Sequence, residues 1–275
     1  MKTGYKIVLY GVALAVVFGG TWAVGAIAGP APEPVEKPMA HNEHQAEPVG
    51  VPPGLSVSEN GYTLQLHENE SIGFHISGPD GKPVTKFAVE HEKRLHLIVV
   101  RRDGSGFRHV HPEMAADGMW SIPLTLSEAG SYRVFADFKP ENGPKTTLGA
   151  DVQVAGDYQP KQYAGSRTFT VDGYEVTLDG ELTAGSASTV TIGISKDGKP
   201  VTDLQNYLGA KGHLVALRAA DLAYLHVHPE ESDQVKFAVQ VPTTGTYRLF
   251  LDFQHEGTVR TAEFTLTTGE AGHGH

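Results

Sequence analysis

Apolar and polar residues alternate along short stretches of the chain, which is the pattern of half-buried β-strands. Residues 62–66 and 174–178 alternate regularly, whereas residues 95–101 form an almost continuous apolar run that suits a central strand. Further strands are expected at residues 72–77, 120–126, 146–154, 190–195, 214–218, 237–241 and 258–266, and at the Tyr-Arg-x-Phe segments that begin at Tyr132 and Tyr247. After residue 30, helical spacing is limited to a weak pattern at residues 203–208. The pattern therefore predicts an all-β fold.

Four sequence blocks occur twice in the same order, so most of the chain consists of two copies of one module. The blocks are Asp-Gly-Lys-Pro-Val at 80–84 and 197–201, His-Leu at 96–97 and 213–214, His-Val-His-Pro at 109–112 and 226–229, and Tyr-Arg-x-Phe-x-Asp-Phe at 132–138 and 247–253. The first three blocks are offset by 117 residues and the last by 115. The first repeat is predicted to span residues 55–156 and the second repeat residues 165–269. Short strands and turns at this density are typical of two tandem Ig-like β-sandwiches.

The N-terminal segment predicts export. Lys2 and Lys6 precede an uncharged apolar run at residues 7–28, which has about the length that crosses a bilayer as a helix. Basic residues before the run and acidic residues after it place the N-terminus inside and the remainder outside. Residues 1–28 are therefore predicted to anchor a single-pass cell-membrane protein with extracytoplasmic C-terminal domains. The Ala26-Ile27-Ala28 sequence also fits a signal-peptide cleavage site, and cleavage there gives a secreted protein.

Residues 29–54 are rich in proline. They are predicted to be an extended tether, because proline fixes φ and lacks a hydrogen-bond donor. The tether contains His41 and His44, and residues 270–275 end the chain in a second His-bearing tail. Histidines in such segments either hold metal weakly or are simply solvated.

Charge and cysteine content exclude several function classes. The chain carries 22 basic and 32 acidic residues and has no cluster of Lys and Arg, so nucleic-acid binding is excluded. With 0 Cys, disulfides, thiolate metal sites and cysteine nucleophiles are excluded. Any transition metal held by the 14 His would therefore have imidazole, carboxylate or thioether ligands. No nucleophile-elbow, phosphate-loop or zincin motif occurs, and the chain is not expected to be an enzyme.

Both repeats retain three histidines and one aspartate while the surrounding residues diverge. The candidate metal ligands are His96, His109, His111 and Asp137 in the first repeat, and His213, His226, His228 and Asp252 in the second. A His-x-His pair on a strand points both rings to one face, and the 13 residues before the pair suffice to place the first histidine on the neighbouring strand. Three imidazoles and a carboxylate suit Cu²⁺ or Zn²⁺. In the first repeat, Met114 and Met119 add thioether sulfur.

The repeated histidines also have a structural interpretation. Pro112 and Pro229 end strand pairing, so each His-x-His-Pro is also a strand end whose rings hydrogen-bond neighbouring carbonyls. The histidines without a counterpart are expected to be surface or packing residues; they are His67, His75, His91 and His255.

Parts of both repeats resemble bacterial extracytoplasmic Ig-like domains that handle copper. The resemblance is carried by residues 95–112 with 130–138 and by residues 213–229 with 245–253. The similar types are the copper-resistance C-type β-sandwich and the YtkA-like and FixH-like envelope domains. The copper-resistance C-type site uses the mature N-terminal histidine, whereas cleavage after Ala28 would expose Gly29 here. The resemblance therefore implies an envelope β-sandwich in copper handling, without a transfer of the family's ligands.

These features together predict an exported, membrane-anchored protein that buffers or delivers copper or zinc, with one His-rich site in each β-sandwich. Its expected partners are the membrane, through the N-terminal helix, and an envelope metal-transport protein. The alternative is a metal-free envelope scaffold or protein-interaction module whose repeated histidines are structural.

Overall fold

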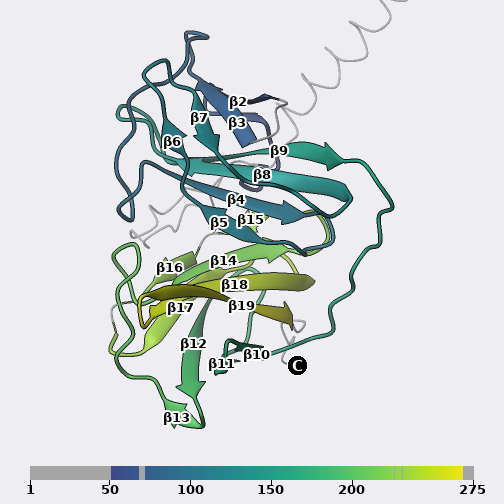
Figure 1. Cartoon of the computed structure of the whole chain (residues 1–275), viewed down its shortest axis with the longest axis vertical. Helices are drawn as coiled ribbons and strands as arrows, with labels where there is room; N and C mark the ends of the chain where they lie inside the picture. Colours follow the sequence, from purple (N-terminus) through teal and green to yellow (C-terminus); the bar gives the residue numbers. More distant parts are fainter. Residues whose placement is uncertain (1–50, 68–71, 226, 231, 269–275) are drawn as a thin grey trace, which may run out of the picture. The chain divides into compact units, whose positions relative to one another are not determined.

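The structure of the chain is a computed structural model that describes residues 51–67, 72–225, 227–230 and 232–268. These residues lie in one compact unit, Gly50–His275. Their regular elements are all β-strands, which pair antiparallel into four sheets, so the all-β prediction is confirmed (Figure 1). None of these residues belongs to a helix long and apolar enough to cross a membrane. The predicted anchor at residues 1–28, the tether up to residue 50 and the tail at residues 270–275 lie outside the described residues.

Strands of the first repeat form two sheets, which together are called the first sandwich. In neighbour order, one sheet contains β1 (Ser58–Glu59), β2 (Tyr62–His67), β3 (Ile72–Ser77), β7 (Trp120–Ile122) and β6 (Glu113–Met114), and the other contains β5 (Arg108–Val110), β4 (Leu95–Arg101), β8 (Gly130–Phe138) and β9 (Thr146–Val154). Phe74 and Trp120 from the first of these sheets pack with Leu97 and Val134 from the second in one buried core. Burial of the apolar positions thus joins the two sheets face to face.

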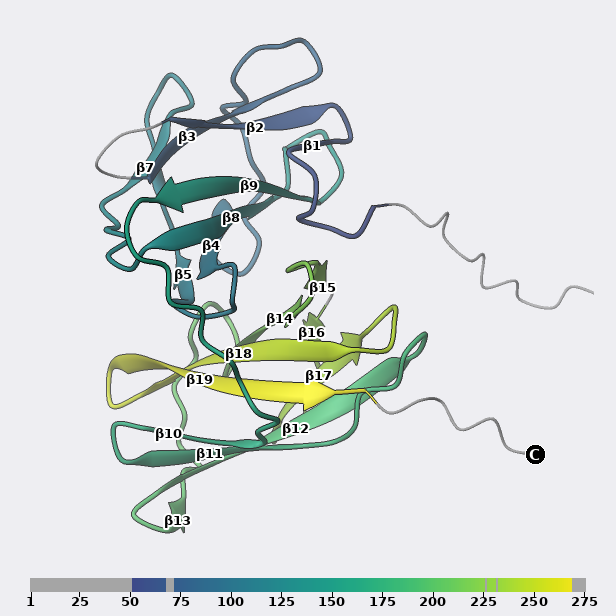
Figure 2. The same cartoon turned by 90° about the vertical axis from the view of Figure 1, so that its right-hand side faces the viewer.

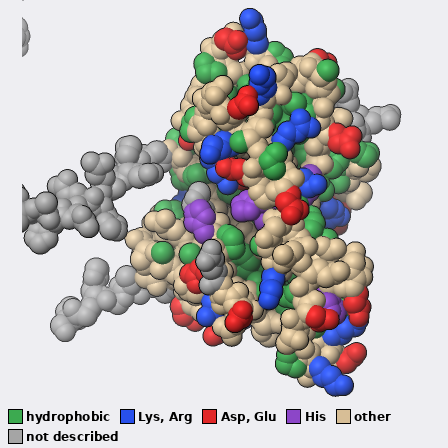
Figure 3. Space-filling model, turned by 90° about the vertical axis from the view of Figure 1, so that its left-hand side faces the viewer, with side chains coloured by type: hydrophobic (Ala, Val, Ile, Leu, Met, Phe, Trp, Pro, Cys, Tyr) green, Lys and Arg blue, Asp and Glu red, His purple; other side chains and the backbone are tan. Residues whose placement is uncertain are grey.

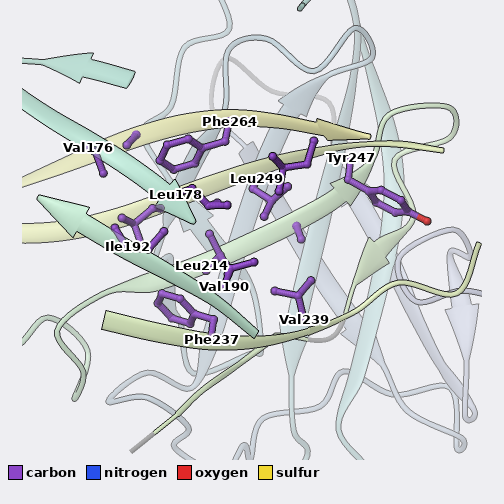
Figure 4. Close-up of a cluster of buried hydrophobic side chains, with 14 of the residues drawn as sticks. Val176, Leu178, Val190, Ile192, Leu214, Phe237, Val239, Tyr247, Leu249 and Phe264 are labelled. Carbon is purple, nitrogen blue, oxygen red and sulfur yellow. The ribbon is translucent and has the colours of Figure 1, made fainter. Parts of the chain in front are cut away.

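The second repeat forms a second sandwich in the same way. One sheet contains β10 (Thr168–Val171), β11 (Tyr174–Asp179), β12 (Ala187–Lys196), β17 (Val235–Gln240) and β16 (Val227–Pro229), with β13 (Lys199–Pro200) paired to β12, and the other contains β15 (Tyr224–Leu225), β14 (His213–Arg218), β18 (Thr246–His255) and β19 (Thr258–Thr267). Figure 2 separates these two layers, and Figure 4 shows Val190 and Phe237 from one sheet beside Leu249 and Phe264 from the other.

Several strand predictions match the observed bounds. Residues 72–77, 95–101 and 146–154 are β3, β4 and β9. The expected strand at 120–126 is shorter: β7 ends at Ile122, because Pro123 has no N–H to donate to a neighbouring strand. The weak helical pattern at 203–208 gives no helix, since Tyr207 and Ala210 hydrogen-bond to each other across a tight turn.

The two sandwiches pack against each other through outward faces of the β4–β8 and β14–β18 sheets. Ile98 and Val100 of β4 share a buried apolar cluster with Val215 and Leu217 of β14. Alternate residues of β4, including Leu97, enter the core of the first sandwich instead. Strand β4 is therefore buried on both faces, which accounts for its almost continuous apolar sequence.

Candidate metal centre

Strands β4 and β5 bring the three histidines of the first repeat together. The strands pair antiparallel, with Leu97 opposite Val110 and Ile98 opposite His109. Because alternate residues of a strand share a face, His96 and His109 lie on the face of Ile98, away from the core of the first sandwich. His111 follows His109 by two residues and lies in the same group.

The ring nitrogens of His96, His109 and His111, here called the triad, converge. Nδ1 of His96 lies 3.0 Å from Nε2 of His109 and 3.2 Å from Nε2 of His111. One ring nitrogen from each residue lies within 4.8 Å of the other two. A tetrahedral ion with metal–nitrogen bonds of about 2.0–2.1 Å holds its ligand nitrogens about 3.3 Å apart. The two separations from His96 Nδ1 are close to that edge length, so the geometry of the triad is compatible with a bound ion.

Two of the triad rings are oriented through their other nitrogen. His96 Nε2 lies 3.1 Å from the carbonyl oxygen of Glu90, and His109 Nδ1 lies 2.8 Å from Oδ2 of Asp252. Thr261 in turn donates its hydroxyl to Oδ1 of Asp252 over 2.6 Å. Both ring contacts face acceptors, so the N–H of each ring points outward and the lone pair points into the triad. Such outer contacts are how proteins orient histidine ligands of metals.

The triad is electrically suited to a cation. Burial, together with the neighbouring His109, lowers the pKa of His96 to about 3. Burial and the same neighbour also lower the pKa of His111 to about 3. The neutral His96 ring, whose Nε2 proton points to the carbonyl of Glu90, directs the lone pair of Nδ1 into the triad, where a cation is able to bind it.

The repeated aspartates, Asp137 and Asp252, lie outside the group of converging ligands and have different partners. Asp137 accepts a hydrogen bond from Thr147 over 2.9 Å and lies 3.5 Å from the ammonium of Lys145. Asp252 belongs to the second repeat but contacts His109 of the first. The structure therefore places Asp252 behind a candidate ligand, where it orients the ring.

The second repeat does not reproduce the triad among the residues that the structure describes. His213 begins β14 and its Nε2 lies 3.1 Å from the carbonyl oxygen of Leu208. Burial lowers the pKa of His213 to about 4. His226 lies outside the described residues, and His228 is exposed on β16. The His213 ring lies across the sandwich interface from the triad, with its centroid 6.3 Å from that of His109.

The methionines of the first repeat lie elsewhere. Met114 packs against the core of the first sandwich. Met119 lies beside Gly73 in the sheet that does not carry the triad. Neither thioether therefore joins the triad.

A cavity of about 220 Å³ opens beside the triad, and five histidines are among its lining residues. They are His91, His96, His109, His213 and His228. Figure 3 shows histidine side chains gathered on one face of the molecule. The sequence predicts a surface or packing role for His91, because the equivalent position of the second repeat is Leu208. The feature of the sequence that points to His91 is its position five residues before His96, which is one of the repeated histidines.

A family model describes most of this body. The model of a domain of unknown function, DUF8832, matches residues 51–158 and residues 169–270. The chain belongs to this family. The matched segments begin and end near the limits of the two repeats. The search of curated proteins found no match.

Among solved structures, the chain is similar to a two-domain fibronectin type III segment of chicken tenascin, at 10% identity over 76% of this chain and 100% of that chain, with a TM-score of 0.24. A putative membrane-anchored protein from Corynebacterium diphtheriae is 11% identical over 77% of this chain and 59% of that chain, with a TM-score of 0.23. The glucan-utilization protein SGBP-B of Bacteroides ovatus is 15% identical over 81% of this chain and 46% of that chain, with a TM-score of 0.21. Scores of this size support no conclusion about this chain.

Proposed function

We propose that the protein is an exported metal-binding protein whose triad holds one Cu²⁺ or Zn²⁺ ion, and that it buffers or delivers this metal outside the cytoplasm. The proposal depends on one observation, the convergence of Nδ1 of His96 with Nε2 of His109 and of His111. Imidazole nitrogen suits both ions, and the usual affinity order favours Cu²⁺ where copper is available. We also propose that each sandwich is Ig-like, on the basis of its two antiparallel sheets packed over one core.

The role proposed is binding, without catalysis. Hydrolytic metal sites commonly combine the ion with a general acid or base supplied by the protein. The two buried carboxylates near the triad are already engaged, Asp137 by Thr147 and Lys145, and Asp252 by His109. A carrier needs no such base, and its natural partner is a metal-transport protein of the envelope.

Calorimetric titration with Cu²⁺ and with Zn²⁺ tests the proposal. The full chain is purified in detergent with His41, His44, His273 and His275 changed to alanine, so that the terminal histidines do not contribute; this protein is the tail-free parent. We expect the tail-free parent to bind metal and the added pair His96→Ala and His109→Ala to abolish tight binding. The control pair is His67→Ala and His75→Ala, because these rings also meet, at 2.8 Å, but on an exposed sheet face.

The second candidate function is a metal-free scaffold. The distance between the ring nitrogens of His96 and His109 also fits this function. A nitrogen separation of 3.0 Å is also a hydrogen-bond length, which a single shared proton between His96 and His109 would satisfy. In that case the tail-free parent binds neither ion and the triad variants change only stability.

The anchor is a separate part of the proposal. The apolar run at residues 7–28, preceded by Lys2 and Lys6, supports insertion into a membrane. Mass spectrometry of the mature N-terminus tests it: an intact N-terminus in the membrane fraction supports the anchor, and Gly29 as the first residue means secretion.

A further inference from the structure

The cavity beside the triad contains a second pair of histidines. His91 comes from the first repeat and His213 from the second, and both line the cavity with His96 and His109. Their ring centroids lie 5.2 Å apart, with the ring planes at 82°. Within the triad, the centroid separations are 5.0–5.3 Å. The second pair therefore has the ring spacing of the triad.

The pair lies next to the triad but outside it. The His91 centroid is 6.0 Å from that of His96, and the His213 centroid is 6.4 Å from that of His96 and 6.3 Å from that of His109. These separations exceed every separation within the triad. The two rings of the pair are thus set apart from the three rings of the triad.

Each ring of the pair is held by a tight turn. Residues 90–93 form a two-residue β-turn in which Glu90 and Lys93 exchange backbone hydrogen bonds of 2.9 and 3.0 Å. Both central residues have positive φ, 46° at His91 and 63° at Glu92, where Asn-Gly is the favoured sequence. Such backbone strain is concentrated at functional sites, and here it presents an exposed imidazole to the cavity.

The second repeat has a matching turn at residues 207–210. Tyr207 and Ala210 exchange backbone hydrogen bonds of 2.8 and 3.2 Å, with φ of 54° at Leu208 and 82° at Gly209. The carbonyl of Leu208 takes the Nε2 proton of His213, which leaves Nδ1 of that ring to bind an ion. The turn of the first repeat thus contains the His91 imidazole, and the turn of the second repeat orients the His213 imidazole, which lies on β14.

We propose that His91 and His213 form a second, exchangeable metal position at the mouth of the cavity, through which Cu²⁺ or Zn²⁺ reaches the triad. This inference deepens the proposed function and depends on it. Two imidazoles hold an ion less tightly than three, and His91 is exposed to solvent whereas His96 is buried. An ion therefore meets the pair first and moves inward to the stronger site, where His96 is buried and His109 and His111 are half-buried.

The test is a Zn²⁺ titration by calorimetry, with stopped-flow measurement of loading, on the tail-free parent. The variants are His91→Asn, since asparagine also accepts positive φ, and His213→Gln, whose amide is able to keep the contact to Leu208. We expect two equivalents in the parent, one tight and one weak, and loss of the weak one in either variant. Loading of the tight site should also slow, while its affinity stays the same. The control pair His67→Ala and His75→Ala should change neither measurement.

The outcomes separate this inference from the proposed function. No binding by the parent overturns both. A single equivalent in the parent, retained with an unchanged loading rate in both variants, overturns the second position alone. A single equivalent that weakens in His213→Gln also overturns it, because His213 is then a fourth ligand of the triad ion. Thermal melts of each variant check that the variant is still folded, so that loss of a bound metal equivalent is not caused by unfolding.

Discussion

Asp252 of the second repeat accepts a hydrogen bond from Nδ1 of His109 of the first repeat over 2.8 Å. The side chains are only 6% and 4% exposed, so the contact is shielded from water. A candidate ligand in one repeat is therefore oriented by a carboxylate in the other. The equivalent aspartate of the first repeat, Asp137, accepts a hydrogen bond from Thr147 and lies 3.5 Å from the ammonium of Lys145.

Asp252→Asn should weaken Cu²⁺ or Zn²⁺ binding by about 10–100-fold, because an outer partner that fixes a histidine ligand has that effect on affinity. Competition with a chromophoric chelator measures the change. Asp137→Asn is the matched control and should leave affinity nearly unchanged. Equal losses in the two variants would show that Asp252 does not orient the site.

Packing between the sandwiches should also control affinity. Leu217 is fully buried in the interface and Leu249 is fully buried in the core of the second sandwich. Changing either to alanine should cost about 2–5 kcal/mol of the free energy of unfolding. Only Leu217→Ala should also weaken metal binding. The space left by this truncation lies in the interface, where it loosens the contact between His109 and Asp252. Urea unfolding measures the loss of stability in each variant, and chelator competition on the same samples measures the change in metal affinity.

Metal should stabilise the folded chain. An ion that binds only the folded state, at 100 times its Kd, raises the free energy of unfolding by about 2.7 kcal/mol. The melting temperature of the tail-free parent should therefore rise when Zn²⁺ is added and return to its starting value when a chelator is added. The double variant His96→Ala and His111→Ala should show no such rise; an equal rise there would place the binding elsewhere.

The strand pattern was predictable because it is local. A period of two over five or more residues marks β2 and β11, and a continuous apolar run marks β4. Short strands such as β5 and β15 contain too few residues to show a period. The position of His96 beside the His-x-His pair follows from one strand pairing, so sequence spacing alone anticipates it.

The remainder of the site depends on how the sandwiches pack, which the sequence does not state. Asp137 and Asp252 are equivalent by sequence, and only the interface makes one of them the partner of His109. The sequence does not single out His91, because its counterpart in the second repeat is a leucine. Its importance comes from the proximity of His213, which lies in the other repeat.

Acid should weaken the attachment of the linker between the repeats. Burial opposes ionisation of Asp103, but hydrogen bonds from the Lys161 backbone, Arg101 and Ser105 outweigh it and lower its pKa to about 2. A lowered folded-state pKa contributes stability above the unfolded value of about 3.9, and that contribution is lost as the pH falls towards 2. Asp103→Asn should therefore cost about 2–3 kcal/mol at pH 7, with the difference from the parent shrinking below pH 4. Urea unfolding at several pH values measures it, and a difference that does not change with pH would contradict the prediction.

The apolar face that joins the sandwiches also has a historical consequence. A lone ancestral module with this face would have exposed Ile98, Val100 and Phe135 to water unless it paired with itself. Fusion of such a homodimer into one chain would free the two copies from symmetry. The first copy is then able to keep His91 where the second has Leu208, and the second is able to place Asp252 against His109 of the first. Permanent attachment thus allows the two repeats to differ at these positions.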